Sequence, residues 1–232
     1  MKAFESKKQL ITFVVMAVVA GVCIALALFT YDGVLLHTGN KLLGALAFSI
    51  GLILCVFLKC DLFTGKAFVY AADVFQKKKT LPLAFGFLGL VFLLNAVGSI
   101  AASGLYALSS PSDAAKEIFE QTARTKAELS IGIIFVRAVL CNLFVSLGMF
   151  FALKFKDKPA LVVCMIVLCI FPFVLLGFEH SVANVGVFSI ALMTGAKIGA
   201  GAIALNLTFS MLGNLVGGVL IALMFAAKQF EY

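Results

Sequence analysis

Residues 177–184 read Gly-Phe-Glu-His-Ser-Val-Ala-Asn, and they interrupt a long apolar run. The run before them, residues 160–176, is long enough to cross most of a bilayer, and apolar sequence resumes over residues 185–193. Ionisable side chains are costly at membrane depth, so they generally face a cavity or a partner on the path of a polar solute. This polar break therefore predicts a discontinuous helix whose freed backbone groups line a protein-lined or water-lined space.

The composition of the chain indicates an integral membrane protein. Of its 232 residues, 63% are hydrophobic and only 12% are charged, and the mean hydropathy is +1.14. Soluble domains are typically about 45–50% apolar and about 25% charged. We therefore predict an all-α polytopic membrane protein in which residues 1–232 form one transmembrane channel domain. The net charge of +7 lies in short basic clusters between apolar runs, which argues against a nucleic-acid partner.

Six apolar spans are predicted along the chain. They cover about residues 10–29, 42–75, 81–108, 129–153, 160–193 and 202–227. The second span has its own polar break, over residues 59–66, and the connector over residues 109–128 is the one segment that looks soluble. With the N-terminus inside, the inner segments carry ten Lys and Arg residues and the outer segments carry five. The positive-inside rule then predicts that both termini are cytoplasmic.

The two halves of the chain share a plan. Spans 2 and 5 are both broken, and spans 3 and 6 carry the similar signatures Asn-Ala-Val-Gly (residues 95–98) and Asn-Leu-Val-Gly (residues 214–217). Because each half, about residues 1–108 and 129–227, has an odd number of spans, the two insert in opposite senses. The sequence thus predicts an inverted 3+3 repeat with a site near the midplane, where the broken helices meet.

Three residues in the breaks are the first candidates for chemistry. His180 could donate a hydrogen bond or a proton to an anion or weak acid, because imidazole titrates near physiological pH. The alternative is a buried histidine that only ties the break together. The Thr64 hydroxyl in the other break could reach His180 across the pseudo-two-fold axis. For Glu179 we expect a structural role at the break, because an anion path disfavours an exposed carboxylate.

Lysines and asparagines near the spans are further candidates. Lys66 could bias the local potential towards anions or extend to the interface, and Lys59 is expected to pair with its neighbour Asp61. Lys126 could draw anions towards the outer mouth, or it could be an ordinary solvated lysine. The asparagines could line the lumen or join helix-to-helix hydrogen bonds, and apolar residues could form constrictions. The asparagines are Asn142 and Asn214, and the apolar residues are Phe48, Leu52, Phe63 and Phe173.

The cysteines are interpreted as small buried hydrophobic residues. There are six, and none forms a Cys-x-x-Cys pair: Cys23, Cys55, Cys60, Cys141, Cys164 and Cys169. Only two histidines occur, so the ligand groups look too scattered for a zinc site, and we expect no metal and no cofactor. A serine hydrolase using His180 and Ser181 is disfavoured, because no Gly-x-Ser-x-Gly elbow is present. We therefore expect no enzyme activity.

Four segments resemble the formate/nitrite transporter family. They are Asp-Leu-Phe-Thr-Gly at 61–65, the stretch 177–184, Cys-Asn at 141–142, and Gly-Asn-Leu-Val-Gly-Gly at 213–218. The resemblance implies an aquaporin-like fold of six spans and a homopentamer with one pore per protomer. It implies passage of small monovalent anions such as formate, nitrite or hydrosulfide across a bacterial or archaeal inner membrane.

The resemblance also implies roles for individual residues. Thr64, on an omega-shaped loop, faces His180 midway in the pore, and Lys126 lies towards the outer vestibule. Asn142 and Asn214 lie near the lumen. Apart from the resemblance, we expect Glu179 and Asn184 to have a structural role at the break. The narrow apolar slits come from Leu52, Phe173, Phe48, Leu62 and Phe63.

Two features and one alternative bear on the substrate. Lys66 follows the Thr-Gly pair, and the connector over residues 194–201 is short. Both features give nitrite and hydrosulfide the same weight as formate, and the lysine favours hydrosulfide slightly. The alternative is a neutral-solute channel of the aquaporin or ammonia type. The repeat fits that alternative, but the paired Asn-Pro-Ala motifs of aquaporins are absent.

Overall fold

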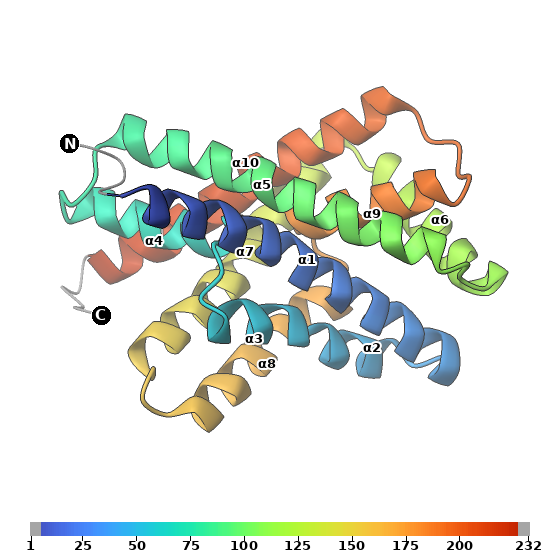
Figure 1. Ribbon diagram of the computed structural model, residues 1–232, viewed down its shortest axis with the longest axis horizontal. Helices are drawn as coiled ribbons and strands as arrows, with labels where there is room; N and C mark the ends of the chain where they lie inside the picture. The colour runs from blue at the N-terminus through green and yellow to red at the C-terminus, as the bar shows by residue number, and fades with distance from the viewer. Residues whose placement is uncertain (1–5, 227–232) are drawn as a thin grey trace.

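The computed structural model describes residues 6–226, and within that range the chain is helical and contains no strand. Figure 1 shows the arrangement of the helices. In chain order they are α1 (Lys7–Thr38), α2 (Lys41–Phe48), α3 (Ile50–Phe57), α4 (Phe63–Phe75), α5 (Leu81–Leu108), α6 (Asp113–Ala127), α7 (Ile131–Lys154), α8 (Pro159–Leu175), α9 (Ser181–Met193) and α10 (Ala200–Ala226).

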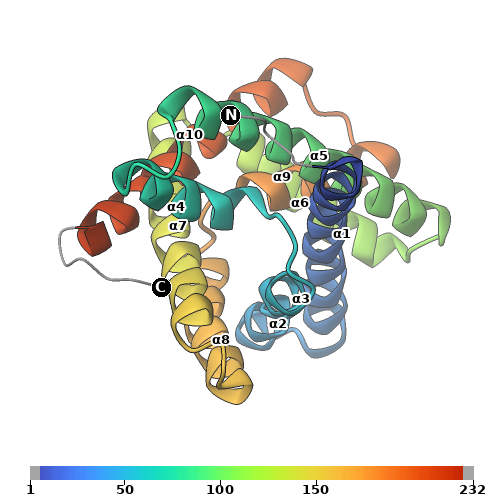
Figure 2. The same cartoon turned by 60° about the vertical axis from the view of Figure 1, so that its left-hand side comes forward.

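Four of these helices, α1, α5, α7 and α10, are long and apolar enough to cross a membrane. The predicted second span is divided into α2–α3 and α4, and the predicted fifth span into α8 and α9. The half-helices α2–α3 and α8 pack side by side on one side of the molecule (Figure 1). Turning the molecule shows α4 and α9 on the other side, beside α5 and α10 (Figure 2). Both predicted breaks are therefore present.

Two boundaries differ from the sequence prediction. The first break covers residues 58–62 rather than 59–66, because α4 begins at Phe63. Thr64 consequently lies in the first turn of a helix, so the expectation of an omega-shaped loop at this residue is wrong. The connector predicted over residues 109–128 contains α6, which packs on α9 and whose buried residues Ala115 and Phe119 recur at helical spacing.

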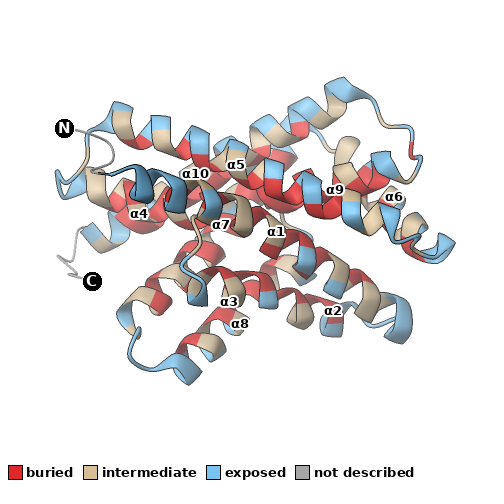
Figure 3. Cartoon of the chain, in the orientation of Figure 1, coloured by how far each residue is buried: buried red, intermediate tan, exposed pale blue. Residues whose placement is uncertain are grey.

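The long helices of each half pack with their backbones in contact. A Cβ atom on Gly98 would collide with the carbonyl oxygen of Val18, so α5 can approach α1 this closely only with glycine there. In the second half, a Cβ on Gly217 would lie 2.5 Å from the carbonyl oxygen of Val139, at the matching contact of α10 with α7. Figure 3 shows that burial concentrates along α9 and on the inner faces of the long helices, whose outer faces are exposed.

Candidate functional site

The two breaks share one backbone geometry. Helix α3 is followed by Lys59 with φ 56°, and helix α8 is followed by Gly177 with φ 67°, both in the left-handed region. The amide of Cys60 donates to the carbonyl of Cys55 at 2.7 Å, and the amide of Phe178 donates to the carbonyl of Phe173 at 3.0 Å. This left-handed turn after a helix is the Schellman arrangement, which satisfies the last helical carbonyls.

A buried asparagine makes hydrogen bonds that hold the first break against its neighbouring helices. Asn95 on α5 accepts a hydrogen bond at Oδ1 from the amide of Phe63, at 2.8 Å. Its Nδ2 donates to the carbonyl of Ala17 on α1 at 2.7 Å and to the carbonyl of Asp61 in the break at 2.9 Å. Sequence reasoning used Asn95 only as part of the repeat signature and missed this role.

Asn214 fastens the second break in the same way. Its Oδ1 accepts from the amide of Ser181 at 2.9 Å. Its Nδ2 donates to the carbonyl of Ala138 on α7 at 2.8 Å and to the carbonyl of Glu179 at 2.9 Å. The oxygen and the nitrogen of the side chain are thus both used by backbone atoms. Of the two alternatives considered for Asn214, the geometry matches helix-to-helix hydrogen bonding.

Asn142 on α7 joins the first turn of α4 to α10. Its Nδ2 donates to the carbonyl of Thr64 at 3.2 Å and to the carbonyl of Asn214 at 2.5 Å. The residue is completely buried, and it is absent from the walls of the three cavities described below. Its position therefore matches a structural bridge rather than a surface of the lumen.

Thr64 and His180 meet, as predicted. Thr64 Oγ1 lies 3.0 Å from His180 Nε2, and both residues are almost fully buried. His180 is also the N-cap of α9, since its Nδ1 accepts from the amide of Ala183 at 3.2 Å. We assign the ring tautomer from this geometry. With Nδ1 as the acceptor, the neutral ring carries its proton on Nε2 and donates it to the threonine hydroxyl.

Glu179 is the centre of a buried polar network. Its Oε1 accepts from Lys126 Nζ at 2.7 Å, and its Oε2 accepts from Asn184 Nδ2 at 2.6 Å and from Asn206 Nδ2 at 3.1 Å. Asn184 also donates to Asn206 Oδ1 at 2.8 Å. The carboxylate is only 1% exposed, and its negative charge is compensated by the Lys126 ammonium group and by the amide hydrogen bonds. Asn206 was missed by sequence reasoning, because a single asparagine in an apolar run carries no distinguishing pattern.

The matching acidic residue of the first break pairs with a different lysine than predicted. Asp61 Oδ1 lies 2.6 Å from Lys66 Nζ, so the expected pair of Lys59 with Asp61 is wrong. Lys59 occupies the left-handed turn, whereas Lys66 lies in the first turns of α4, near enough to fold back onto the break. The positive charge of Lys66 is therefore compensated by its partner.

Three cavities lie in a row through the breaks. The first, of about 160 Å³, contains Lys126 and Asp32 in its wall, and we call it the Lys126 cavity. A central chamber of about 10 Å³ follows, and Phe48, Phe173 and His180 line both spaces. A third cavity of about 440 Å³, here the Lys66 cavity, shares the side chain of Leu62 with the chamber.

The central chamber is narrow and apolar. Its volume is about that of one water molecule. Apart from His180 its walls are apolar: Ile24, Phe48, Leu52, Leu62, Val145, Ile170 and Phe173. The rings of Phe48 and Phe173 meet edge to face with centroids 6.2 Å apart. Four of the five residues expected at the constrictions are thus present at this narrow point.

The fifth residue expected at a constriction lies elsewhere. Phe63 is not in the wall of any of the three cavities, and its ring packs edge to face on Phe92 with centroids 5.3 Å apart. The cause is the early start of α4, which turns the side chain of Phe63 towards α5 while its amide bonds to Asn95.

Comparison with known proteins agrees with this geometry. The family model described as "Formate/nitrite transporter" matches residues 2–227. The chain belongs to the formate/nitrite transporter family. It is 28% identical over 183 residues to the uncharacterized transporter YrhG of Bacillus subtilis, covering 77% of this chain and 68% of that one. It is 28% identical over 198 residues to a formate-nitrite transporter of Plasmodium falciparum, covering 80% of this chain and 64% of the relative.

Solved structures show the same fold. The chain matches an "FNT family ion channel" with a TM-score of 0.87 at 24% identity, covering 95% of this chain and 91% of the other. It matches a "Pentameric formate channel with formate bound" with a TM-score of 0.81 at 25% identity, covering 95% and 97%. The predicted fold is confirmed, because such channels have the aquaporin-like fold. The chain is a multi-pass membrane protein of a non-enzymatic transporter family.

In this formate/nitrite transporter the cysteines are not all scattered. Cys23, Cys55 and Cys60 come together with their sulfur atoms within 4.8 Å of one another. The expectation that the ligand groups lie too far apart is therefore wrong for these three. Their separation in sequence hid the contact, which depends on α1 and α3 packing against the first break.

Proposed function

We propose that this formate/nitrite transporter conducts small monovalent anions of weak acids, with formate, nitrite and hydrosulfide as the candidates. The observation that carries the proposal is the hydrogen-bonded pair of Thr64 and His180 beside a narrow apolar chamber between two cavities. This pair supplies a polar hydrogen, that of the Thr64 hydroxyl, at the point where an anion loses most of its water. One of the matched structures is a formate channel with formate bound, which supports the anion class.

The apolar walls of the chamber destabilise an anion, and the Thr64–His180 pair offsets part of that cost. An anion stripped of water in apolar surroundings is destabilised by several kcal/mol or more. Because His180 Nε2–H is donated to Thr64 Oγ1, the hydroxyl hydrogen of Thr64 is left to turn towards the passing ion and replace part of its hydration. Protonation of the anion to the neutral acid removes the remaining cost. The proton comes from water, either directly or through His180 after the ring has taken up a second proton to become imidazolium, since the imidazole is the titratable group on the chamber wall.

The two lysines at the ends of the path have compensated charges. Lys126 is paired with Glu179 and Lys66 with Asp61, each through an N–O contact below 3 Å. Both pairs lie close to a break, so each adds a link between that break and a neighbouring segment while leaving little net charge. We infer that Lys66 gives weak discrimination among the three anions, so hydrosulfide gains no advantage from it.

The assembly and orientation are part of the proposal. We expect a homopentamer with one pathway per protomer, in line with the pentameric channel that the chain resembles. Both termini are expected on the cytoplasmic side of a bacterial or archaeal inner membrane, because the basic segments cluster there. The Lys66 cavity, with Lys156 at its edge, then opens to the cytoplasm.

The test is anion flux in proteoliposomes, measured for formate, nitrite, hydrosulfide and chloride at two pH values. Selective flux of one weak-acid anion that is abolished or loses its pH dependence in His180→Phe supports the proposal and names the substrate. Unchanged flux of the variant at both pH values removes His180 from the mechanism. Passage of water or ammonia without any anion supports the neutral-solute alternative.

A further inference from the structure

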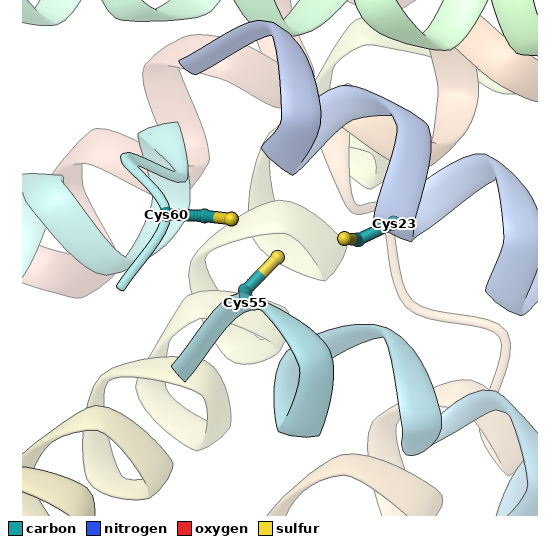
Figure 4. Close-up of side chains that lie close together, drawn as sticks. All are labelled: Cys23, Cys55 and Cys60. Carbon is teal, nitrogen blue, oxygen red and sulfur yellow. The ribbon is translucent and has the colours of Figure 1, made fainter. Parts of the chain in front are cut away.

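Three thiol groups converge beside the first break. Cys23 projects from α1, Cys55 from α3 and Cys60 from the break itself, and Figure 4 shows the three sulfur atoms pointing towards a common centre. Every pair of sulfur atoms lies within 4.8 Å. Cys23 and Cys55 are buried at 3% exposure each, whereas Cys60 is half-buried. The group thus combines two enclosed thiols with one at an accessible edge.

The fold itself does not require cysteine at these positions. The matching turn of the second break has Phe173 and Phe178 in place of Cys55 and Cys60. Cys23 lies six residues after Ala17, and Phe144 lies six residues after Ala138, the residue that matches Ala17 through the asparagine bonds. The second half therefore fills all three positions with phenyl rings, and the first half replaces them with three small thiols.

The cluster is reachable from the Lys66 cavity. Cys55 and Cys60 lie in the wall of this 440 Å³ space, together with Lys59 and Lys66. A small ion that enters the cavity therefore comes up against two of the three cysteine residues. The Lys59 ammonium group on the same wall offsets part of the negative charge that thiolates acquire on binding a metal, whereas the charge of Lys66 is already compensated by Asp61.

The ligand set selects one class of metal. Thiolate sulfur is a soft donor that favours Cu(I) over the hard divalent ions. Structural zinc sites take four ligands, and within residues 6–226 this group has three metal-binding side chains. We propose that Cys23, Cys55 and Cys60 form a three-sulfur binding site for a soft monovalent cation, Cu(I). Binding forms three metal–sulfur bonds, and the displaced thiol protons pass to water in the Lys66 cavity.

The site lies next to the anion pathway, so a bound metal ion can affect flux. Cys60 is two residues before Leu62, whose side chain separates the Lys66 cavity from the central chamber. Tying Cys60 to α1 and α3 through a metal restricts the break at that point, so the bound ion is expected to slow anion flux. This consequence rests on the proposed function, whereas the binding itself does not.

The binding test uses the full-length protein, reduced and kept under anaerobic conditions in detergent. Cu(I) is titrated in competition with the chromophoric chelator bathocuproine disulfonate. We expect one Cu(I) per chain, with X-ray absorption giving three sulfur neighbours. Cys60→Ser and Cys55→Ser should each lower the affinity by at least about tenfold. The matched control is Cys164→Ser, which replaces an exposed cysteine outside the cluster and should bind as wild type does.

The outcomes separate the proposal from its rivals. Wild-type affinity in Cys60→Ser, loss of binding in Cys164→Ser, or a two-sulfur environment overturns the site. If Cys55→Ser fails to fold, Cys60→Ser decides, since its side chain lies at the edge of the cavity. As a second readout, Ag(I) should protect Cys60 from a maleimide reagent, and equal labelling with and without Ag(I) contradicts the proposal. Flux that Cu(I) leaves unchanged while binding occurs refutes only the effect on the pathway.

Discussion

Asn95 and Asn214 make the same three hydrogen bonds in opposite halves of the chain. Each accepts from the amide at the start of a half-helix and donates to one carbonyl in the break and one on a neighbouring long helix. A broken helix leaves backbone groups without partners at membrane depth, and one asparagine on each side supplies them. The positions of Thr64 and His180 thus depend on two side chains that lie outside the cavity walls described above.

Replacing Asn95 with alanine should destabilise the protein by about 2–3 kcal/mol, because the buried amide of Phe63 then loses its partner. We expect a lower midpoint of thermal unfolding in detergent. The matched control is Thr125→Ala, whose hydroxyl bonds only within its own exposed helix turn and should have little effect. Equal midpoints for the Asn95 variant and the wild type would show that water takes over the hydrogen bond to the Phe63 amide.

Glu179→Ala should cost about 3–5 kcal/mol of stability, because it leaves Lys126 with an unpaired charge and removes the acceptor for Asn184 and Asn206. The control is Glu120→Ala, which breaks an ion pair with Arg124 at the surface of α6 and should cost less than about 1 kcal/mol. Thermal unfolding of both variants measures the difference. Similar losses for the two variants would contradict a structural role for Glu179.

Thr64→Val keeps the shape of the side chain and removes the hydroxyl that bonds to His180. We expect anion flux to fall about tenfold, which corresponds to about 1.4 kcal/mol, the upper range for one hydrogen bond. Thr64→Ser retains the hydroxyl and should keep most of the flux. Flux in proteoliposomes under equal anion gradients is the measurement. If valine and serine behave alike, the hydroxyl has no part in conduction.

The sequence contained enough information to place both breaks and the pairing of Thr64 with His180. Polar residues at membrane depth are rare, so the motif around His180 stands out against its apolar flanks. The shared order of breaks and Asn-x-x-Gly signatures then indicated which segments meet. The buried contacts of Glu179 agree with the structural role expected for it, since a carboxylate at this depth requires partners.

Other features depend on three-dimensional packing and could not be predicted in the same way. The lysine that pairs with Asp61 is set by the start of α4 at Phe63, and helix boundaries are poorly defined in sequence. Asn206 meets Glu179 only because α10 passes behind the second break. The cysteine cluster joins residues from α1, α3 and the break, with no local spacing to reveal it.

The left-handed turns of the two breaks predict a stability difference. Lys59 adopts φ 56°, where a side chain is disfavoured, while Gly177 adopts the same conformation in the second break. Lys59→Gly should therefore raise stability by about 0.5–1 kcal/mol, and Gly177→Ala should lower it by about 1 kcal/mol. Lys59→Met removes the charge but keeps the side chain, so it should give no gain. Equal gains for the glycine and methionine variants would assign the effect to charge.

Asp32 predicts a way to increase conduction. Its side chain lies in the wall of the Lys126 cavity, and only one carboxylate oxygen has a partner among residues 6–226, Tyr106 Oη at 3.4 Å. An ionised carboxylate there repels an entering anion by about 1 kcal/mol, so Asp32→Asn should raise anion flux at neutral pH about fivefold. Asp113→Asn, at the exposed start of α6, is the control and should leave flux unchanged. A decrease in flux for Asp32→Asn would instead show that the carboxylate assists transport, for example by carrying a proton to the anion.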